Sequence, residues 1–154
     1  MTPMEYAIKA MENAARNYKK DLEAMTEEQI VDSVSGSARK PVDFTYEVAL
    51  LNKDAAARIA GTERPVEPEG DEWWTAPPEL QSKQAITDYM VNCCDELIEA
   101  AKANVENGDK NVGIEGRVRP AYDLVNFSMM HTMYHCAQLN FIQSMADDMK
   151  MHWF

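Results

Sequence analysis

The chain has 154 residues and carries 15 Lys and Arg against 26 Asp and Glu, a formal net charge of −11 at pH 7. This acidic balance argues against a nucleic-acid-binding protein, which would cluster lysine and arginine. No apolar run approaches the roughly 18 residues that cross a bilayer, and the first residues lack the basic and apolar parts of a secretion signal. We therefore expect one domain over residues 1–154 of a soluble, cytoplasmic protein.

The chain has three cysteines, Cys93, Cys94 and Cys136. Two of them are adjacent in a segment with a helical pattern, where neighbouring side chains point about 100° apart and bridge poorly. No pair has the Cys-x-x-Cys spacing of a zinc site. We expect small buried side chains in a reducing compartment, not disulfides or thiolate ligands.

Four segments carry apolar side chains at alternating steps of three and four residues, which is the pattern of an amphipathic helix. They are residues 4–25, 43–60, 82–105 and 120–149. Gly61 ends the second segment, Ser82 is a suitable N-cap for the third, and Pro120 suits the first turn of the fourth. The short run 113–118 is the one strand candidate. We predict an all-α protein, a four-helix bundle with long crossover connections.

The connection at residues 62–78 contains four prolines and two adjacent tryptophans, Trp73 and Trp74. It is too long and too rich in proline for a tight hairpin, so we expect it to cross the surface or one end of the bundle. The two indoles have three possible roles: lining the mouth of a pocket, forming a dimer contact, or packing the connection onto the helices.

The fourth segment places two histidines and a glutamine on the face expected to point into the bundle. Its inward positions are Leu124, Ser128, His131, His135, Gln138, Ile142 and Met145. Residues four apart on a helix have Cβ atoms about 5–6 Å apart, so His131 and His135 can bind one divalent metal. The alternative is a pair of ordinary core histidines, but burying two unpaired imidazoles is costly. The spacing therefore favours a metal site.

A catalytic metal site generally has three protein ligands and one open position. The remaining histidine, His152, lies beyond the expected end of the fourth helix. Helical register makes Glu47 of the second segment the best third ligand, although a carboxylate in a first helical turn is also favoured by the helix dipole. Gln138, one turn beyond His135, can orient a metal ligand or a substrate, or bond to another helix.

Residues 131–143, HTMYHCAQLNFIQ, resemble the C-terminal signature of the DinB-like, YfiT-type four-helix bundles. That signature joins two histidines to a small residue, Gln and Leu, shortly before an Asp and a terminal Trp. Asp147 or Asp148 and Trp153 occupy those places here. The glycine-ended second helix, the proline-rich crossover and Pro120 also match, so the resemblance covers essentially the whole chain.

The resemblance implies a divalent metal, often zinc or nickel, bound by two histidines of the fourth helix and one of the second. His131 and His135 are the first two ligands by this comparison. The second segment has no histidine, and the family position falls at or very near Glu47. A carboxylate is a competent ligand, so the resemblance leaves two outcomes: a His₂Glu site, or a weakened or empty one.

Characterised members of that family include thiol S-transferases that use bacillithiol or mycothiol, and a mycothiol-dependent maleylpyruvate isomerase. The resemblance thus implies a metal-dependent enzyme, transferase-like or hydrolase-like, in which the metal activates a low-molecular-weight thiol or a water. The alternative is a non-catalytic stress-related or binding bundle with a degenerate or empty site. Family habit also predicts a homodimer, as do the large aromatic side chains Trp73, Trp74, Trp153 and Phe154.

Overall fold

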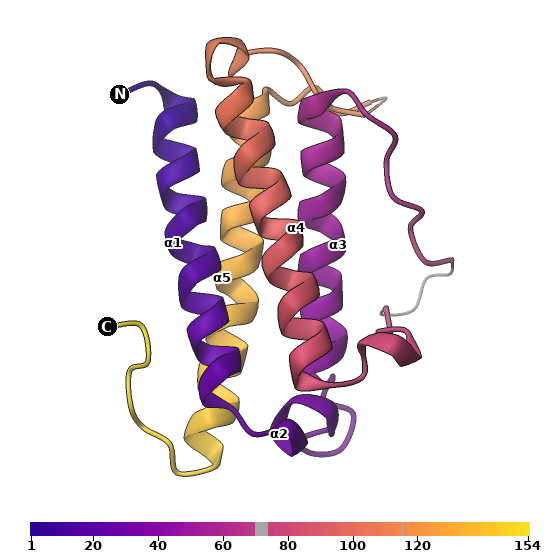
Figure 1. The fold of residues 1–154 in the computed structure, drawn as a ribbon, viewed down its shortest axis with the longest axis vertical. Helices are drawn as coiled ribbons and strands as arrows, with labels where there is room; N and C mark the ends of the chain where they lie inside the picture. The colour runs from indigo at the N-terminus through magenta and orange to yellow at the C-terminus, as the bar shows by residue number, and fades with distance from the viewer. Residues whose placement is uncertain (70–73, 115) are drawn as a thin grey trace.

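The computed structural model describes residues 1–69, 74–114 and 116–154, and these residues form five α-helices and no strand. The helices are α1 (Pro3–Ala24), α2 (Glu27–Val31), α3 (Pro41–Ala60), α4 (Lys83–Ala103) and α5 (Ala121–Met145), with 3₁₀ turns η1 (Pro78–Leu80) and η2 (Val105–Asn107). Figure 1 shows the four long helices side by side, with α2 at one end. The all-helical class is confirmed, and within the described residues no helix is long and apolar enough to cross a membrane.

Local chemistry sets most helix ends where the sequence predicts them. Thr2 and Glu5 form a reciprocal capping box at the start of α1. Gly61 ends α3 in the left-handed conformation, at φ 71°, where glycine has no Cβ to clash. The Ser82 hydroxyl accepts a hydrogen bond from the amide of Ala85 at 3.2 Å and caps α4.

Three details differ from the prediction. Helix α5 ends at Met145 instead of Met149, because Asp147 adopts a positive φ of 61° and the amide of Asp148 bonds back to the carbonyl of Gln143. Helix α2 was not expected, since five residues are too few to show a period. The strand candidate 113–118 is not a strand; in the described part of this connection there is only an isolated bridge between Asn111 and Pro120.

Buried side chains of all four long helices form one hydrophobic cluster. Its fully buried large members include Met4, Met11, Tyr18, Leu22, Ile59, Ile86, Met90, Leu97 and Leu139. The three cysteines are buried and unpaired, as predicted. Burial raises the pKa of Cys93 to about 11 and that of Cys94 to about 12, so neither thiol ionises at neutral pH.

Helix α5 is apolar on its solvent side as well. Its exposed side chains after Asp123 form what we call the α5 outer face: Phe127, Met130, Tyr134, Ala137, Phe141 and Met145. Met145 was predicted to point inward, but it lies at the last residue of the helix and is exposed. No residue with a formal charge at pH 7 occurs between Asp123 and Asp147. A helix that is apolar all round is unusual on a free surface.

Candidate metal centre

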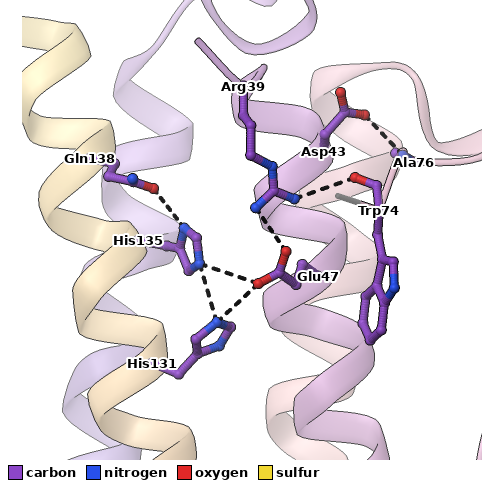
Figure 2. A network of polar contacts seen from close by, with 8 residues as sticks. All are labelled: Arg39, Asp43, Glu47, Trp74, Ala76, His131, His135 and Gln138. Carbon is purple, nitrogen blue, oxygen red and sulfur yellow. Dashed lines mark hydrogen bonds and ion pairs between the residues drawn. The ribbon is translucent and has the colours of Figure 1, made fainter. Parts of the chain in front are cut away.

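The three side chains predicted as metal ligands face one another between α3 and α5 (Figure 2). Oε1 of Glu47 lies 3.3 Å from Nε2 of His131 and 3.7 Å from Nε2 of His135. The two imidazole Nε2 atoms are 3.2 Å apart. The histidines occupy one face of α5 because they are four residues apart. The structure therefore brings together all three residues, and this group could hold a metal ion.

The three ligand candidates are shielded from solvent. Their side chains are 13%, 17% and 5% exposed for Glu47, His131 and His135 respectively. The ring of Phe44 stacks on His135 with centroids 5.2 Å apart, and Phe127 stacks on His131 at 6.3 Å. These aromatic neighbours restrict how the imidazole planes can rotate.

The hydrogen bond between His135 and Gln138 decides which nitrogen of His135 carries the proton. Nδ1 of His135 lies 2.7 Å from Oε1 of Gln138. An amide oxygen only accepts, so Nδ1 of the histidine must donate, and the neutral ring keeps a lone pair on Nε2. That lone pair points toward His131 and Glu47. Gln138 thus sits where the sequence predicts a residue that orients a ligand.

His131 lacks such a partner. Its Nδ1 atom is buried and has no hydrogen-bond partner within the described part of the chain. Its Nε2 faces two acceptors, the carboxylate of Glu47 and the lone pair of His135. Either a proton on that nitrogen or a cation at the centre of the three atoms satisfies this arrangement.

The second oxygen of Glu47 is held by Arg39, which precedes α3. A guanidinium nitrogen of Arg39 lies 2.8 Å from Oε2 of Glu47, and another donates to the carbonyl of Trp74 at 3.3 Å. Burial alone would raise the pKa of the Glu47 carboxyl, but the hydrogen bond with His131 and the charge and hydrogen bond of Arg39 outweigh burial and hold that pKa well below its usual value. Glu47 is therefore an anion at neutral pH.

The distances among the three atoms match what a tetrahedral metal requires. With metal–ligand bonds of about 2.0–2.1 Å, two ligands of a tetrahedral zinc lie about 3.3 Å apart. The observed separations are 3.2, 3.3 and 3.7 Å. Two imidazoles and a carboxylate suit zinc and neighbouring transition metals. Three protein ligands also leave a fourth position open for water or substrate.

A cavity of about 330 Å³ lies beside His131. Its walls come from α3, from α5, and from the connections that follow α3 and α4. His131 is the member of the candidate metal group that lines it. A molecule in this cavity can therefore approach the group from the His131 side.

The other predicted side chains lie elsewhere or serve other contacts. Trp73 is outside the described residues, and Trp74 is half-buried, with its carbonyl bonded to Arg39. His152 pairs with Asp148 at 2.8 Å. The indole of Trp153 donates to Asp21 at 2.9 Å, so it faces α1.

Arg39 was not predicted as part of the site. It lies outside the periodic part of α3, so helical register gave no signal for it. Its basic character was visible, but its contact with Glu47 depends on how the preceding segment folds onto the helix.

Neither the known protein-family models nor the curated proteins contain a match to this chain.

Proposed function

We propose that Glu47, His131 and His135 bind one divalent transition metal, with zinc and nickel as the first candidates. We further propose a metal-dependent enzyme of the thiol S-transferase or hydrolase type. The observation that carries this proposal is the convergence of one carboxylate oxygen and two Nε2 atoms, with separations of 3.2–3.7 Å. A metal held by three protein ligands lowers the pKa of a thiol or water in the open position.

The neighbouring side chains have clear parts in this proposal. Gln138 keeps the proton of His135 on Nδ1 and so presents the Nε2 lone pair to the metal. Arg39 takes the outer oxygen of Glu47 and leaves Oε1 as a single ligand. The cavity beside His131 supplies room for a substrate or a low-molecular-weight thiol.

Membership of the DinB-like, YfiT-type bundles is part of the same proposal. The signature at residues 131–143 supports it, as do four long helices and the long segments 61–82 and 104–120 between the later ones. Because these connecting segments are long, they also support a bundle with crossover connections. A single domain spanning residues 1–154 remains our expectation.

The decisive experiment is calorimetric titration of tag-free, metal-stripped protein with Zn²⁺ and Ni²⁺. We expect one metal per chain. His135→Ala should weaken binding by at least about 100-fold, more than the loss of an outer partner costs. His152→Ala is the matched control, because His152 bonds to Asp148 and takes no part in the group, and it should bind like the parent chain. Equal affinities for both variants would refute the site.

Cobalt distinguishes the two reaction types. We expect Co²⁺-loaded protein to gain a thiolate-to-cobalt charge-transfer band when 2-mercaptoethanol is added if the open position takes a thiol. A spectrum that changes with pH but not with thiol favours a hydrolase. No response to thiol or to pH would count against both activities while leaving metal binding intact.

The ion pair of Arg39 with Glu47 favours a second candidate, a binding bundle without a metal. In that case Arg39 neutralises the carboxylate, and Nε2 of His131 carries a proton and donates it to Glu47. The two candidates differ in the titration above: the second one takes up no metal at any loading.

We also propose a homodimer, with the α5 outer face as the contact in place of the tryptophans. Two chains of charge −11 repel one another, so they associate most easily through a surface without charge. The α5 outer face is such a surface, and it exposes 63% of Tyr134 and 66% of Phe141.

Tyr134→Glu tests the dimer. It places a charge at the centre of the α5 outer face, and sedimentation at micromolar concentration should show a shift from dimer to the 17.4 kDa monomer. Tyr6→Glu is the matched control, since Tyr6 on α1 is also 63% exposed. A parent chain that sediments only as a monomer would exclude the dimer.

A further inference from the structure

The arginines of this chain gather around the candidate metal centre and its cavity. The chain has six arginines and nine lysines. Five of the six arginines contact the centre, line the cavity or bond to an acidic residue that lines it: Arg39, Arg58, Arg64, Arg117 and Arg119. The sixth, Arg16, is exposed on α1. Among the described residues, no lysine lines the cavity. Arginine presents a planar fork that binds a carboxylate or phosphate through two hydrogen bonds, whereas lysine acts as a point charge.

The acidic residues of the cavity are already neutralised. Asp54 pairs with Arg58 at 2.6 Å through one oxygen and with Arg64 through the other. Arg64 also pairs with Glu67 at 3.0 Å. In these pairs, Arg58 and Arg64 neutralise Asp54 and Glu67. The positive charge that remains at the cavity is that of Arg117 and Arg119.

Arg119 and Arg117 retain donors for a ligand. Arg119 pairs with the carboxylate of Asp123 at 3.4 Å; the Asp123 side chain is about half exposed, and exposed pairs of this kind are weak. The Arg119 guanidinium lies over the ring of Phe127, 4.7 Å from its centroid. Arg117 forms no ion pair with any described residue. The cavity is therefore positive in a strongly acidic chain.

The connection between α4 and α5 holds these two arginines in place. The amide of Val112 donates to the carbonyl of Arg119 at 2.9 Å, and the side-chain oxygen of Asn111 accepts from the Arg119 amide at 3.0 Å. Gly113 is needed for this turn, because a Cβ there would lie 1.7 Å from the carbonyl oxygen of Arg117. The loop thus supports the arginines through its own backbone.

Apart from Ser128 and His131, the uncharged side chains that line the cavity are apolar. They are Leu51, Val112, Ile114, Leu124 and Phe127. Its volume of about 330 Å³ is at the lower end of the range for small-molecule sites. An anion of small size with an apolar body fits both the charge and the lining.

We infer that this cavity binds a small organic anion, with its carboxylate or phosphate at Arg117 and Arg119 and its apolar body against Leu124 and Phe127. The inference rests on the proposed function insofar as it names the substrate class of the same site. The reacting group of such a molecule would lie on the His131 side of the cavity.

The test is calorimetric titration of zinc-loaded and metal-stripped protein with phenylacetate, phenyl phosphate and 2-phenylacetamide. We expect at least one of the two anions to bind at least tenfold more tightly than the neutral amide. The preferred anion identifies the ligand as a carboxylate or a phosphate. No binding of either anion at millimolar concentration, or equal binding of the amide, would overturn the inference.

Variants locate the binding. Arg117→Gln with Arg119→Gln should weaken anion binding at least tenfold and leave zinc affinity unchanged. Arg16→Gln removes the same kind of charge from α1 and should change neither affinity. Gly113→Ala keeps both guanidinium groups but displaces the loop, so it should also weaken anion binding. Equal loss in the Arg16 variant would show a general charge effect and overturn the site.

The metal-stripped protein separates this inference from the proposed function. If zinc does not bind but anion binding still depends on Arg117 and Arg119, the proposed metal enzyme fails and the anion site stands. If zinc binds and the anions do not, the metal site stands and the anion site fails.

Discussion

Two carboxylates face α5, one from α1 and one from α3, and their neighbours are chemically different. Asp21 of α1 is fully buried, and its Oδ2 accepts from three donors: the thiol of Cys136, the amide of Asn140 and the indole of Trp153. Glu47 of α3 instead faces two imidazoles that can present lone pairs, in addition to Arg39. Donors surround Oδ2 of Asp21, whereas possible metal ligands lie beside Glu47.

The difference separates a structural cluster from a candidate binding site. Oδ2 of Asp21 is satisfied by donors of the protein itself, whereas its Oδ1 is buried and has no hydrogen-bond partner within the described residues. A carboxylate beside two imidazole nitrogens needs a proton or a cation to complete the arrangement, because Gln138 keeps the Nε2 atom of His135 as an acceptor. The Asp21 cluster also fixes the end of the chain, since Lys20 donates to the carbonyl of Trp153 at 3.0 Å.

The largest expected effect is on stability at the Asp21 cluster. Asp21→Ala leaves the fully buried thiol of Cys136 without its acceptor, which costs about 1–3 kcal/mol. It also removes one hydrogen bond each from the partly buried side chains of Asn140, which still donates to the carbonyl of Cys136, and Trp153, at about 0.5–1.5 kcal/mol per bond. We expect the free energy of unfolding in urea to fall by about 3 kcal/mol. Zinc stoichiometry measured on the folded variant should stay the same. A loss below about 1 kcal/mol would contradict the structural role of Asp21.

Glu47→Gln should reduce zinc affinity and leave the stability of the metal-free protein nearly unchanged, the opposite of Asp21→Ala. The amide is a poorer metal ligand than the carboxylate, so we expect zinc affinity to fall about 100-fold, at the upper end of the loss from an outer partner. The unfolding free energy of metal-free protein should change by less than about 1 kcal/mol, because Arg39 is partly exposed and can be solvated. Zinc at 100 times its dissociation constant for the parent chain should add about 2.7 kcal/mol to the free energy of unfolding of the parent chain, and much less to that of the variant. Unchanged zinc affinity would remove Glu47 from the ligand set.

Gln138→Leu tests whether the tautomer of His135 matters. Without an acceptor at Nδ1, the ring loses the partner that keeps its Nε2 lone pair available, and we expect zinc affinity to fall about tenfold. Gln138→Glu keeps an acceptor and should retain affinity. Calorimetry on both variants measures the difference, and equal losses would show that Gln138 acts only by filling space.

The smallest effect concerns the thiol of Cys136. Burial, and then its hydrogen bond to Asp21, hold the pKa of Cys136 well above its ordinary value, so the folded chain keeps this proton. The thiol of the unfolded chain ionises near pH 8.5. Its contribution to stability is therefore complete below about pH 8.5 and is lost as pH rises further, by up to about 1.4 kcal/mol per pH unit.

Urea unfolding between pH 7 and pH 10 measures that loss. Cys136→Ala should remove the part of this pH dependence that comes from the Cys136 thiol. Above about pH 8.5 the free energy of unfolding of the parent chain should therefore fall more steeply than that of the variant. Parallel curves would show that this thiol ionises equally in both states.

Most of the fold could be predicted from the sequence, because long amphipathic helices show their period and their caps. The same register places His131, His135 and Gln138 on one face of α5, and the helical register of the second segment was enough to propose Glu47 as a partner. These features depend on spacing within single helices.

The remainder depends on contacts between distant segments, which periodicity does not record. Arg39 reaches Glu47 from the segment before α3, and Arg117 and Arg119 are positioned by a loop whose backbone bonds were not visible beforehand. Asp21 occupies a core-facing position of α1, but its three donors come from α5 and the chain end. Five-residue α2 had one sequence signal, the capping box of Thr26 and Gln29.

The absence of formal charge on the α5 outer face has a consequence for ionic strength. Contacts between oppositely charged protein surfaces weaken when salt is added, because salt screens the attraction between them. Here nothing on the face itself is attracted by charge, and the repulsion comes from the −11 net charge of each chain. The Debye length shrinks from about 30 Å at 0.01 M salt to about 10 Å at 0.1 M, which screens that repulsion. Added salt should therefore strengthen the homodimer that we propose through the α5 outer face.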